Sequence, residues 1–540
     1  MNKASDLIKQ GRTDEVWKKY CGFLDLSLED FMFIQERLLM EQMHLFAACE
    51  LGRKIMGEKV PTSVEEFQRT VPLTEYEDYE PYLSERREDV LPQIPYLWGH
   101  TSGRSGKYKW VPHTEPAYVK MGEHILAAVI LAMARERGEV RLEEGDVLLY
   151  NTPPRPYSSG LVLMSMAELF RFHFVPPLEE TEDMSFQERI EKSFQMALVT
   201  GIDVIGSITA VLVKMGERFA EGGGGTRLSS HLLHPKALLR LTRALVRSKL
   251  AGRPLLPKDL WQAKGAMCGG TDTSLYKDKI IQYWGVVPHE NYSSTETMGT
   301  AAVQAWNKQG LFFFPDVAFL EFIPEEEWGR NRQDPSYQPR TVLVNEVEPG
   351  QRYEVVITSF DGGPFLRYRM HDLVRFLSRR DEEADIDLPP MVFAGRSDDL
   401  IDLAGFTGLM DEPLVLKAIH ETGIAYVDWT IRKEETKEGA FLHLCIELKD
   451  DVAVEVIRQS VHENLKTLNP FYADLESMLE VQPLKVTLLA RGTFQGYSME
   501  KQAAGADLAH LKPPHMNPSD EIISDLFRLS KQVAGGKEVS

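Results

Sequence analysis

Small, hydroxylated and basic residues are concentrated in one short stretch, GHTSGRSGKYKW, at residues 99–110. Its glycines let backbone N–H groups approach an anion closely, while its hydroxyl groups and lysines add donors and positive charge. A P-loop is excluded because that motif needs Ser or Thr after its Gly-Lys pair, and Tyr108 follows Lys107 here. A hairpin loop that holds a pyrophosphate and a plain turn both fit this stretch taken alone.

Later segments carry residue types that would complete a nucleotide site, and they follow one another in order. Glu296 can hold Mg²⁺, a hard cation that prefers carboxylate oxygen, and Asp372 can accept hydrogen bonds from both ribose hydroxyls. Arg396 can reach ribose or phosphate. The remaining candidates would contact base or phosphate: Tyr292 by stacking, Thr295 through its hydroxyl, and Gly269 and Gly270 through a backbone edge that reads adenine.

Each of these residues also has a purely structural interpretation. Tyr292 would be a core residue and Glu296 a solvated loop acid, while Asp372 would pair with Arg369 across a hairpin and Arg396 would be a surface cation. Taken one at a time, the structural interpretation is favoured. The order and spacing of the whole set favour a nucleotide site instead.

Composition narrows the class of protein. The chain has 540 residues, a hydrophobic fraction of 43% and a charged fraction of 26%, as in ordinary globular proteins. Its net charge of −20 argues against a nucleic-acid partner. The apolar run at residues 125–134 is shorter than the roughly 20 residues that span a bilayer, which predicts a buried helix and no membrane partner. Four widely spaced cysteines and a polar N-terminus predict a cytoplasmic protein.

The elements that must position these residues form two predicted domains. Helical periodicity up to about residue 90 is followed by alternating helices and short apolar runs, and a β-rich pattern begins at about residue 311. We therefore expect an α/β fold: a large N-terminal domain, residues 1–396, with layered sheets, helices and a β-barrel-like part. A small, mobile α+β domain at residues 397–540 would follow it.

The motifs together resemble those of the adenylate-forming superfamily. Its phosphate loop resembles residues 101–109, with Arg104 and Tyr108 as departures, and its Y-x-x-T-E motif is present at residues 292–296. Its Y-R-x-G-D motif fits residues 368–372 except that His371 replaces glycine, and its G-R-x-D-D hinge fits residues 395–399. Segments such as FLEFIP and AHLKPPH are similar to the auxin-responsive acyl-acid amido synthetases, with His515 in place of an arginine, and other segments resemble phenylacetate–CoA ligase.

This resemblance implies an ATP-dependent ligase that uses Mg²⁺. A carboxylic acid would be activated as an acyl-adenylate and then transferred to an amino acid; the alternatives are an acyl-CoA ligase and a non-catalytic nucleotide-binding homologue. The resemblance implies catalytic roles for Lys512, Glu296 and Arg396. It implies that Asp398 is the hinge residue and that it also lies beside the bound nucleotide. It also implies a grip on the leaving pyrophosphate, through Thr101, Ser102, Gly103, Ser105 and Lys109.

Overall fold

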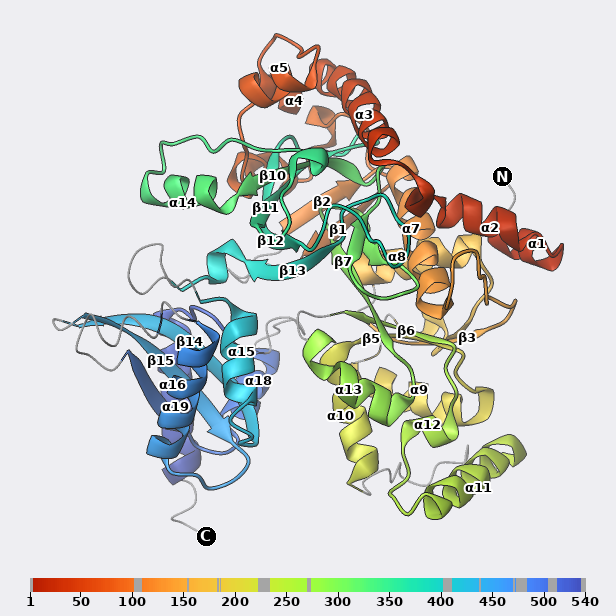
Figure 1. The fold of residues 1–540 in the computed structure, drawn as a ribbon, viewed down its shortest axis with the longest axis vertical. Helices are drawn as coiled ribbons and strands as arrows, with labels where there is room; N and C mark the ends of the chain where they lie inside the picture. The colour runs from red at the N-terminus through yellow and green to blue at the C-terminus, as the bar shows by residue number, and fades with distance from the viewer. Residues whose placement is uncertain are drawn as a thin grey trace. The chain divides into compact units, whose positions relative to one another are not determined.

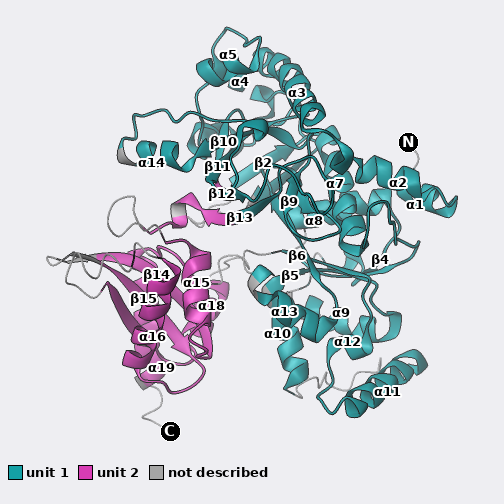
Figure 2. Ribbon diagram, viewed as in Figure 1, with its two compact units in different colours: residues 1–101, 109–370, 374–393 teal, residues 102–108, 371–373, 394–540 magenta. Residues whose placement is uncertain are grey.

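The computed structural model divides the chain into two compact units (Figure 2). Unit 1 contains residues 1–101, 109–370 and 374–393, and unit 2 contains residues 371–373 and those from 394 onward. The predicted domain boundary after residue 396 lies close to this division, and the predicted mobility of the second domain stays a prediction. The structure describes residues 3–101, 109–152, 155–181, 184, 186–221, 234–269, 273–401, 410–436, 439–469, 472, 483–503 and 512–535.

Unit 1 begins with helices, as the periodicity predicts, followed by a pair of strands. The long helix α3 begins after Ser27, whose side chain accepts a hydrogen bond from the Asp30 N–H and so satisfies one of the free N–H groups of the first turn. The elements are α1 (Ala4–Lys9), α2 (Thr13–Tyr20), α3 (Leu28–Ala48), α4 (Glu50–Met56), α5 (Val64–Thr70), α6 (Glu80–Leu83), β1 (Leu97–Thr101) and β2 (Lys109–His113).

One large sheet of eleven strands forms the centre of unit 1 (Figure 1). Its order is β10-β11-β12-β13-β9-β8-β7-β6-β5-β3-β4. The strands β4, β3, β5, β6 and β7 are parallel, and β7, β8, β9 and β13 are antiparallel neighbours. Where a barrel-like part was expected, the β-rich residues from 311 onward contribute antiparallel strands at one end of this sheet. The bounds are β3 (Val147–Asn151), β4 (His173–Val175), β5 (Val204–Ile208), β6 (Gly265–Gly269), β7 (Pro288–Ser294), β8 (Gly299–Gln304), β9 (Leu311–Phe313), β10 (Ala318–Pro324), β11 (Arg352–Ser359), β12 (Tyr368–Phe376) and β13 (Met391–Arg396).

The apolar run at residues 125–134 lies in a buried helix, α7 (Glu115–Met133), as predicted. By length and composition α7 could cross a membrane, but 78% of the relevant window is buried inside unit 1, as in a core helix. Gly122 lets α8 (Ser158–Leu169) approach closely, because a Cβ there would lie 2.8 Å from the Ser165 backbone. The other helices are α9 (Phe186–Thr200), α10 (Thr209–Ala220), α11 (Pro235–Leu250), α12 (Pro257–Leu260), α13 (Thr273–Trp284) and α14 (Glu325–Gln333).

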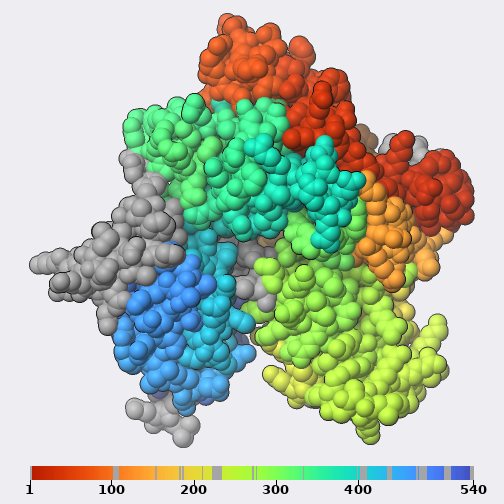
Figure 3. Space-filling view, in the orientation of Figure 1, coloured from red at the N-terminus to blue at the C-terminus, as the bar shows by residue number. Residues whose placement is uncertain are grey.

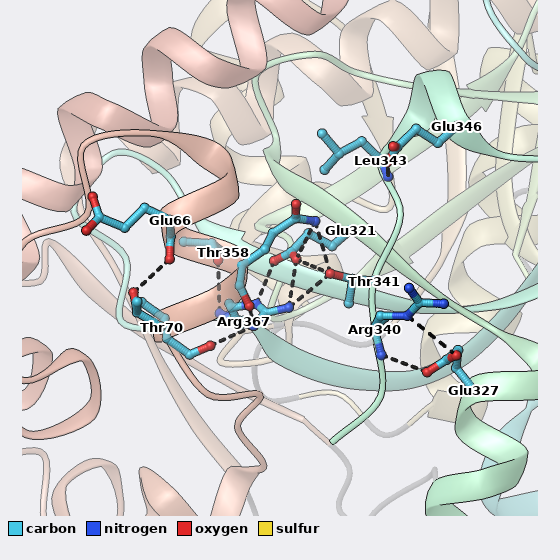
Figure 4. A network of polar contacts seen from close by, with 12 residues as sticks. Glu66, Thr70, Glu321, Glu327, Arg340, Thr341, Leu343, Glu346, Thr358 and Arg367 are labelled. Atoms are coloured by element: carbon cyan, nitrogen blue, oxygen red, sulfur yellow. Dashed lines mark hydrogen bonds and ion pairs between the residues drawn. The ribbon is translucent and has the colours of Figure 1, made fainter. Parts of the chain in front are cut away.

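A buried ion pair ties the N-terminal helices to the sheet just before β12 (Figure 4). Arg367 has a backbone φ of 42°, and its guanidinium donates to both carboxylate oxygens of Glu321 on β10, at 3.1 and 3.0 Å. It also donates to the carbonyl oxygens of Gln68 and Val71 and to the Thr341 hydroxyl. Glu321 has no exposed surface. The hydrogen bonds from Arg367 therefore replace the hydrogen bonds to water that the Glu321 carboxylate loses on burial.

Unit 2 is a small α+β structure, as predicted. Its sheet has the order β14-β15-β16, with β14 and β15 antiparallel and β15 and β16 parallel. Residues 514–517 run beside β14, where Ile431 N–H donates to the His515 carbonyl at 2.7 Å and Asn517 N–H donates back to Ile431. The elements are α15 (Glu412–His420), β14 (Tyr426–Thr436), β15 (Gly439–Leu448), α16 (Val454–Leu468), β16 (Leu484–Leu489), α18 (Thr493–Ala503) and α19 (Asp520–Gly535).

Candidate functional site

The predicted phosphate loop connects two paired strands. Thr101 ends β1 and lies opposite Lys109, the first residue of β2, in an antiparallel pair. Residues 102–108, including the predicted contacts Ser102, Gly103 and Ser105 and the departures Arg104 and Tyr108, lie outside the described residues. The flanking geometry is therefore that of a hairpin, which is the arrangement that the pyrophosphate interpretation requires.

Tyr76 contacts Lys109, and the charge of Glu296 influences the pKa of Tyr76. The sequence did not point to this tyrosine. The Lys109 ammonium lies 4.7 Å from the centre of the Tyr76 ring, and the Tyr76 hydroxyl accepts a hydrogen bond from Trp110 N–H at 3.0 Å. Burial raises the pKa of Tyr76 to about 12, and the negative charge of Glu296 adds to that rise. Tyr76 therefore stays neutral at physiological pH and packs against the Lys109 ammonium.

Glu296 lies half-buried in a tight turn that follows β7. The turn closes through a hydrogen bond from Met298 N–H to the Thr295 carbonyl and through hydroxyl contacts between Ser294 and Thr297. Met298 adopts a left-handed φ of 56°. Among the described residues no group of three or more acidic, histidine or cysteine side chains gathers into a metal cage. One carboxylate fits the way Mg²⁺ binds together with substrate phosphates, keeping several of its waters.

The other predicted nucleotide contacts of unit 1 have mixed placements. Tyr292 is 6% exposed, and its ring stacks on Phe393 at 6.2 Å and meets Phe313 edge-on, so it is also a core residue. Thr295 is buried, and Gly269 ends β6, where no atom lies within 4 Å of an added Cβ. Gly270 lies outside the described residues.

The carboxyl ends of the parallel strands bring in a polar residue that the sequence did not single out. Asn151 ends β3, pairs in register with Ser207 of β5, and is 3% exposed. Neither its amide nitrogen nor its oxygen has a hydrogen-bond partner among the described residues. An orphaned buried amide is costly and requires an explanation such as a ligand. Ligands in open α/β sheets bind at this edge of the parallel strands.

Asp372 and Arg396 form an ion pair in unit 2, on the neighbouring strands β12 and β13. Arg396 Nη1 lies 3.2 Å from the Asp372 carboxylate, which is nearly buried. The alternative pairing of Asp372 with Arg369 is wrong, because Arg369 binds Glu354 through two hydrogen bonds of 2.8 Å. Arg396 is also more than a lone surface cation, because it forms an ion pair with Asp372 although 39% of its side chain is exposed.

His371 occupies a backbone conformation that favours glycine. Its φ is 56°, in the left-handed region, and its Nδ1 lies 3.2 Å from the Ser397 hydroxyl. Histidine is found in this region more often than most other side chains, and glycine, the residue of the motif, adopts it without strain. Asp398 lies in the short 3₁₀ turn at residues 397–399, and its side chain is outside the described set.

Lys512 belongs to a cluster of charged residues beside β14. Its ammonium lies 2.8 Å from Asp428, and 67% of its side chain is exposed. His515 bridges two acids, with Nε2 2.8 Å from Asp428 and Nδ1 2.6 Å from Glu412, and it stacks on Trp429 at 4.4 Å. The sequence identified His515 only as a departure from a motif arginine; its two acidic partners lie far away along the chain.

The charges of this cluster reinforce one another. Burial alone would lower the pKa of His515, but the hydrogen bonds to Asp428 and Glu412 outweigh it and raise the pKa to about 9. Burial would raise the pKa of Asp428, whereas His515 and Lys512 bring it down to about 2. His515 is therefore a cation at neutral pH, and it keeps the positive charge that the motif arginine would supply.

The fold of this chain is similar to the folds of two proteins of known structure. It matches the GH3.15 acyl acid amido synthetase in complex with 2,4-DB with a TM-score of 0.65, at 17% identity, over 94% of this chain and 95% of that one. It matches 2-hydroxyisobutyryl-CoA ligase, in complex with 2-HIB-AMP, with a TM-score of 0.57 at 14% identity over 98% and 94% of the chains. At such low identity these matches establish the fold alone.

The chain belongs to the GH3 family. Models of the GH3 family N-terminal, central and C-terminal domains match residues 22–199, 311–388 and 414–521 in that order. The chain is 25% identical over 226 residues to a jasmonoyl–L-amino acid synthetase of Oryza sativa subsp. japonica. The aligned stretch covers 39% of this chain and 38% of that protein. A second such synthetase, from Nicotiana attenuata, is 23% identical over 46% and 43% of the two chains. The match thus spans less than half of the length of these two relatives. The three GH3 family domains confirm the resemblance inferred from the motifs.

Proposed function

We propose that this protein is an ATP-dependent acyl-acid amido synthetase that uses Mg²⁺. The observation that carries the proposal is the match to all three successive GH3 domains. The same chain places Asp372 on β12 and Arg396 on β13, Glu296 in the turn after β7, and Lys512 against Asp428 of β14. The amido synthetases among its relatives and structural neighbours support the same reaction class. Four buried, free cysteines support the further proposal of a cytoplasmic, reducing location.

In the first half-reaction, a carboxylate of the acid substrate attacks the α-phosphorus of ATP and pyrophosphate leaves. Both reactants are anionic, so the site must supply positive charge and alignment. Lys109 and the hairpin loop would hold the departing pyrophosphate, and Glu296 would hold Mg²⁺, which supplies charge neutralisation between the phosphates. Asp372, aligned by Arg396, would orient the ribose, and Lys512 would stabilise charge developing at the α-phosphate.

In the second half-reaction, the amine of an amino acid attacks the activated carbonyl and AMP leaves. Before that attack the ammonium group of the amino acid must lose a proton, and the amide product retains the acyl carbon. His371 and Arg104 had raised the alternative of a non-catalytic homologue. The left-handed backbone at His371 weakens that alternative, because it is a conformation that the motif glycine would also accept.

Pyrophosphate exchange tests the first half-reaction. The protein is incubated with ATP, labelled pyrophosphate and Mg²⁺, with and without each member of a panel of carboxylic acids. We expect at least one acid to stimulate exchange. A folded protein that binds ATP but gives no exchange with any acid would support the non-catalytic alternative and refute the proposal.

The acceptor is identified by product mass. The acid that supports exchange is incubated with ATP and either a mixture of the twenty amino acids or CoA. An increase by the mass of an amino acid less water is expected. A thioester of CoA with no amide would instead identify an acyl-CoA ligase, the alternative that the sequence left open.

A further inference from the structure

Helix α11 presents an inverted arrangement of small and large residues. Its buried residues Ala237, Ala244 and Ser248 are small, and they follow one line of the helix with the half-buried Leu241. Large apolar side chains outside this line are exposed, and they cover an arc of the helix from beside the buried line to the opposite side. We call this set the apolar face, and its members with their exposed fractions are Leu238 (48%), Leu239 (53%), Leu245 (43%), Val246 (52%) and Leu250 (84%). Full burial of each leucine or valine would be worth about 1.5–3 kcal/mol, so covering this face would be favourable.

Positive charge borders the apolar face. Lys236, Arg240, Arg243 and Arg247 recur at spacings of four, three and four, which places them on one line of a helix; we call them the basic row. From residue 234 to residue 258 the sequence contains no aspartate or glutamate, although the whole chain has a net charge of −20. Arg240 is used within unit 1, where it donates to the Ala197 carbonyl at 3.1 Å, whereas the other three are exposed.

The cations continue past the end of α11 into an open hollow. This hollow has a volume of about 540 Å³ and is lined by Arg247, Arg253 and Lys258, by the rings of Trp261 and Trp284, and by one acid, Asp259. Asp259 is already paired with Arg253 at 2.7 and 2.8 Å. The hollow therefore keeps a net positive lining at the end of the basic row, which contributes Arg247 to it.

We propose that α11 and the adjoining hollow bind the surface of a membrane that contains anionic lipids. The helix lies along the outer edge of unit 1, packed on α9 and α12, and the space-filling view shows the same segment at the surface (Figures 1 and 3). A protruding convex helix needs no groove to receive it at a bilayer, where leucine and valine enter the acyl region and lysine and arginine meet headgroup phosphates. A two-fold symmetric contact with a second copy of this chain is disfavoured, because it would bring the two basic rows together.

This inference departs from the expectation of no membrane partner, which rested on the absence of a spanning segment. A helix that lies in the interface needs no such segment, and the signal was the exposure of the leucines, which composition does not reveal. The proposal is independent of the ligase activity, so its failure would leave that activity untouched.

Sedimentation with vesicles tests the proposal on the full chain. One set of vesicles contains phosphatidylcholine alone, and the other contains phosphatidylcholine and phosphatidylserine in equal amounts. We expect binding to the second set only, and weaker binding as salt is raised. The variant Lys236→Gln with Arg243→Gln should lower the partition coefficient roughly 30-fold, from about 1 kcal/mol for each cation. The matched control, Arg340→Gln with Arg379→Gln, removes the same charge from exposed sites and should bind like the wild type.

The apolar face is tested separately. Leu239→Ser with Val246→Ser should lose binding, while Val454→Ser with Val456→Ser, at two exposed positions in the first turn of α16, should retain it. Circular dichroism confirms that each variant is folded. The proposal would be overturned if the wild type bound neither set of vesicles. It would also be overturned if the α11 variants bound the phosphatidylserine vesicles as well as the wild type does. Light scattering that shows dimers of the wild type and monomers of the α11 variants, without vesicle binding, would assign the face to contact between copies instead.

Discussion

At the residue scale, Glu296 is the side chain on which the first half-reaction depends most. Glu296→Gln keeps the size of the side chain but removes the charge that would hold Mg²⁺. We expect acid-stimulated pyrophosphate exchange to fall about 100-fold or more, the cost of losing one preorganised electrostatic contact to the reacting phosphates. Glu382→Gln, on an exposed loop acid, is the control. Exchange at the wild-type rate in Glu296→Gln would remove Glu296 from the site.

Asn151 makes a different prediction, about the acid substrate. Its two buried polar atoms have no partner among the described residues, so a bound ligand that satisfies them would gain a hydrogen bond without desolvating water-exposed groups. Asn151→Ala should raise the KM for the acid about tenfold and leave the KM for ATP unchanged. Ser165→Ala, at a buried hydroxyl that already donates to the Tyr118 carbonyl, should not change either KM. If Asn151→Ala alters neither KM, the amide is a structural defect and not a substrate contact.

His515 predicts a pH dependence of stability. Its pKa in the folded protein, about 9, is above the ordinary value of 6.5, because Asp428 and Glu412 hold the proton more strongly than burial opposes it. The stabilisation is therefore complete below pH 6.5 and is lost as pH rises through 9. The Tm of the wild type should fall over this window, and that of His515→Gln should fall much less. His420→Gln, an exposed histidine on α15, should behave as the wild type. Parallel curves for His515→Gln and the wild type would contradict the prediction.

At the scale of elements, the Arg367–Glu321 pair fastens β12 to β10 and to the segment that follows α5 (Figure 4). Arg367→Met would leave Glu321 charged and unpaired in the core, which costs about 3–5 kcal/mol of unfolding free energy. Adding Glu321→Leu should recover most of that loss, since a buried ion pair and an apolar pair differ little in net stability. Urea unfolding measures both variants. A double variant no more stable than Arg367→Met alone would show that the other bonds of Arg367 dominate.

The elements also show how far the sequence could be interpreted. Periodicity predicted the helices up to about residue 90 and the core position of residues 125–134, because each depends on local spacing. The sequence pattern also predicted the α+β character of the small unit. The positions of His515, Asp428 and Glu412 depend on residues 514–517 running beside β14, and no local pattern reveals that pairing. Tyr76 was missed for the same reason. It matters because it contacts Lys109, which lies on a different element, β2, and no local pattern around Tyr76 reveals that contact.

At the scale of the whole molecule, the two units carry different parts of the proposed machinery. Glu296 and Lys109 belong to unit 1, whereas Asp372, Arg396 and Lys512 belong to unit 2. The peptide at residues 397–399 follows directly on the strand that carries Arg396. If unit 2 must rotate between adenylation and amide formation, a few residues here must absorb the change in backbone angles.

Asp398→Pro tests this requirement, because proline fixes φ at about −65° and removes the freedom that a rotation needs. We expect acid-stimulated pyrophosphate exchange to persist in Asp398→Pro while amide formation falls at least tenfold. Asp398→Ala is the matched control: it removes the same carboxylate but leaves the backbone free, and it should form amide near the wild-type rate. Both reactions are followed in one preparation, by labelled ATP and by product mass. If Asp398→Pro slows exchange and amide formation equally, or neither, the two half-reactions do not require different backbone conformations at this residue.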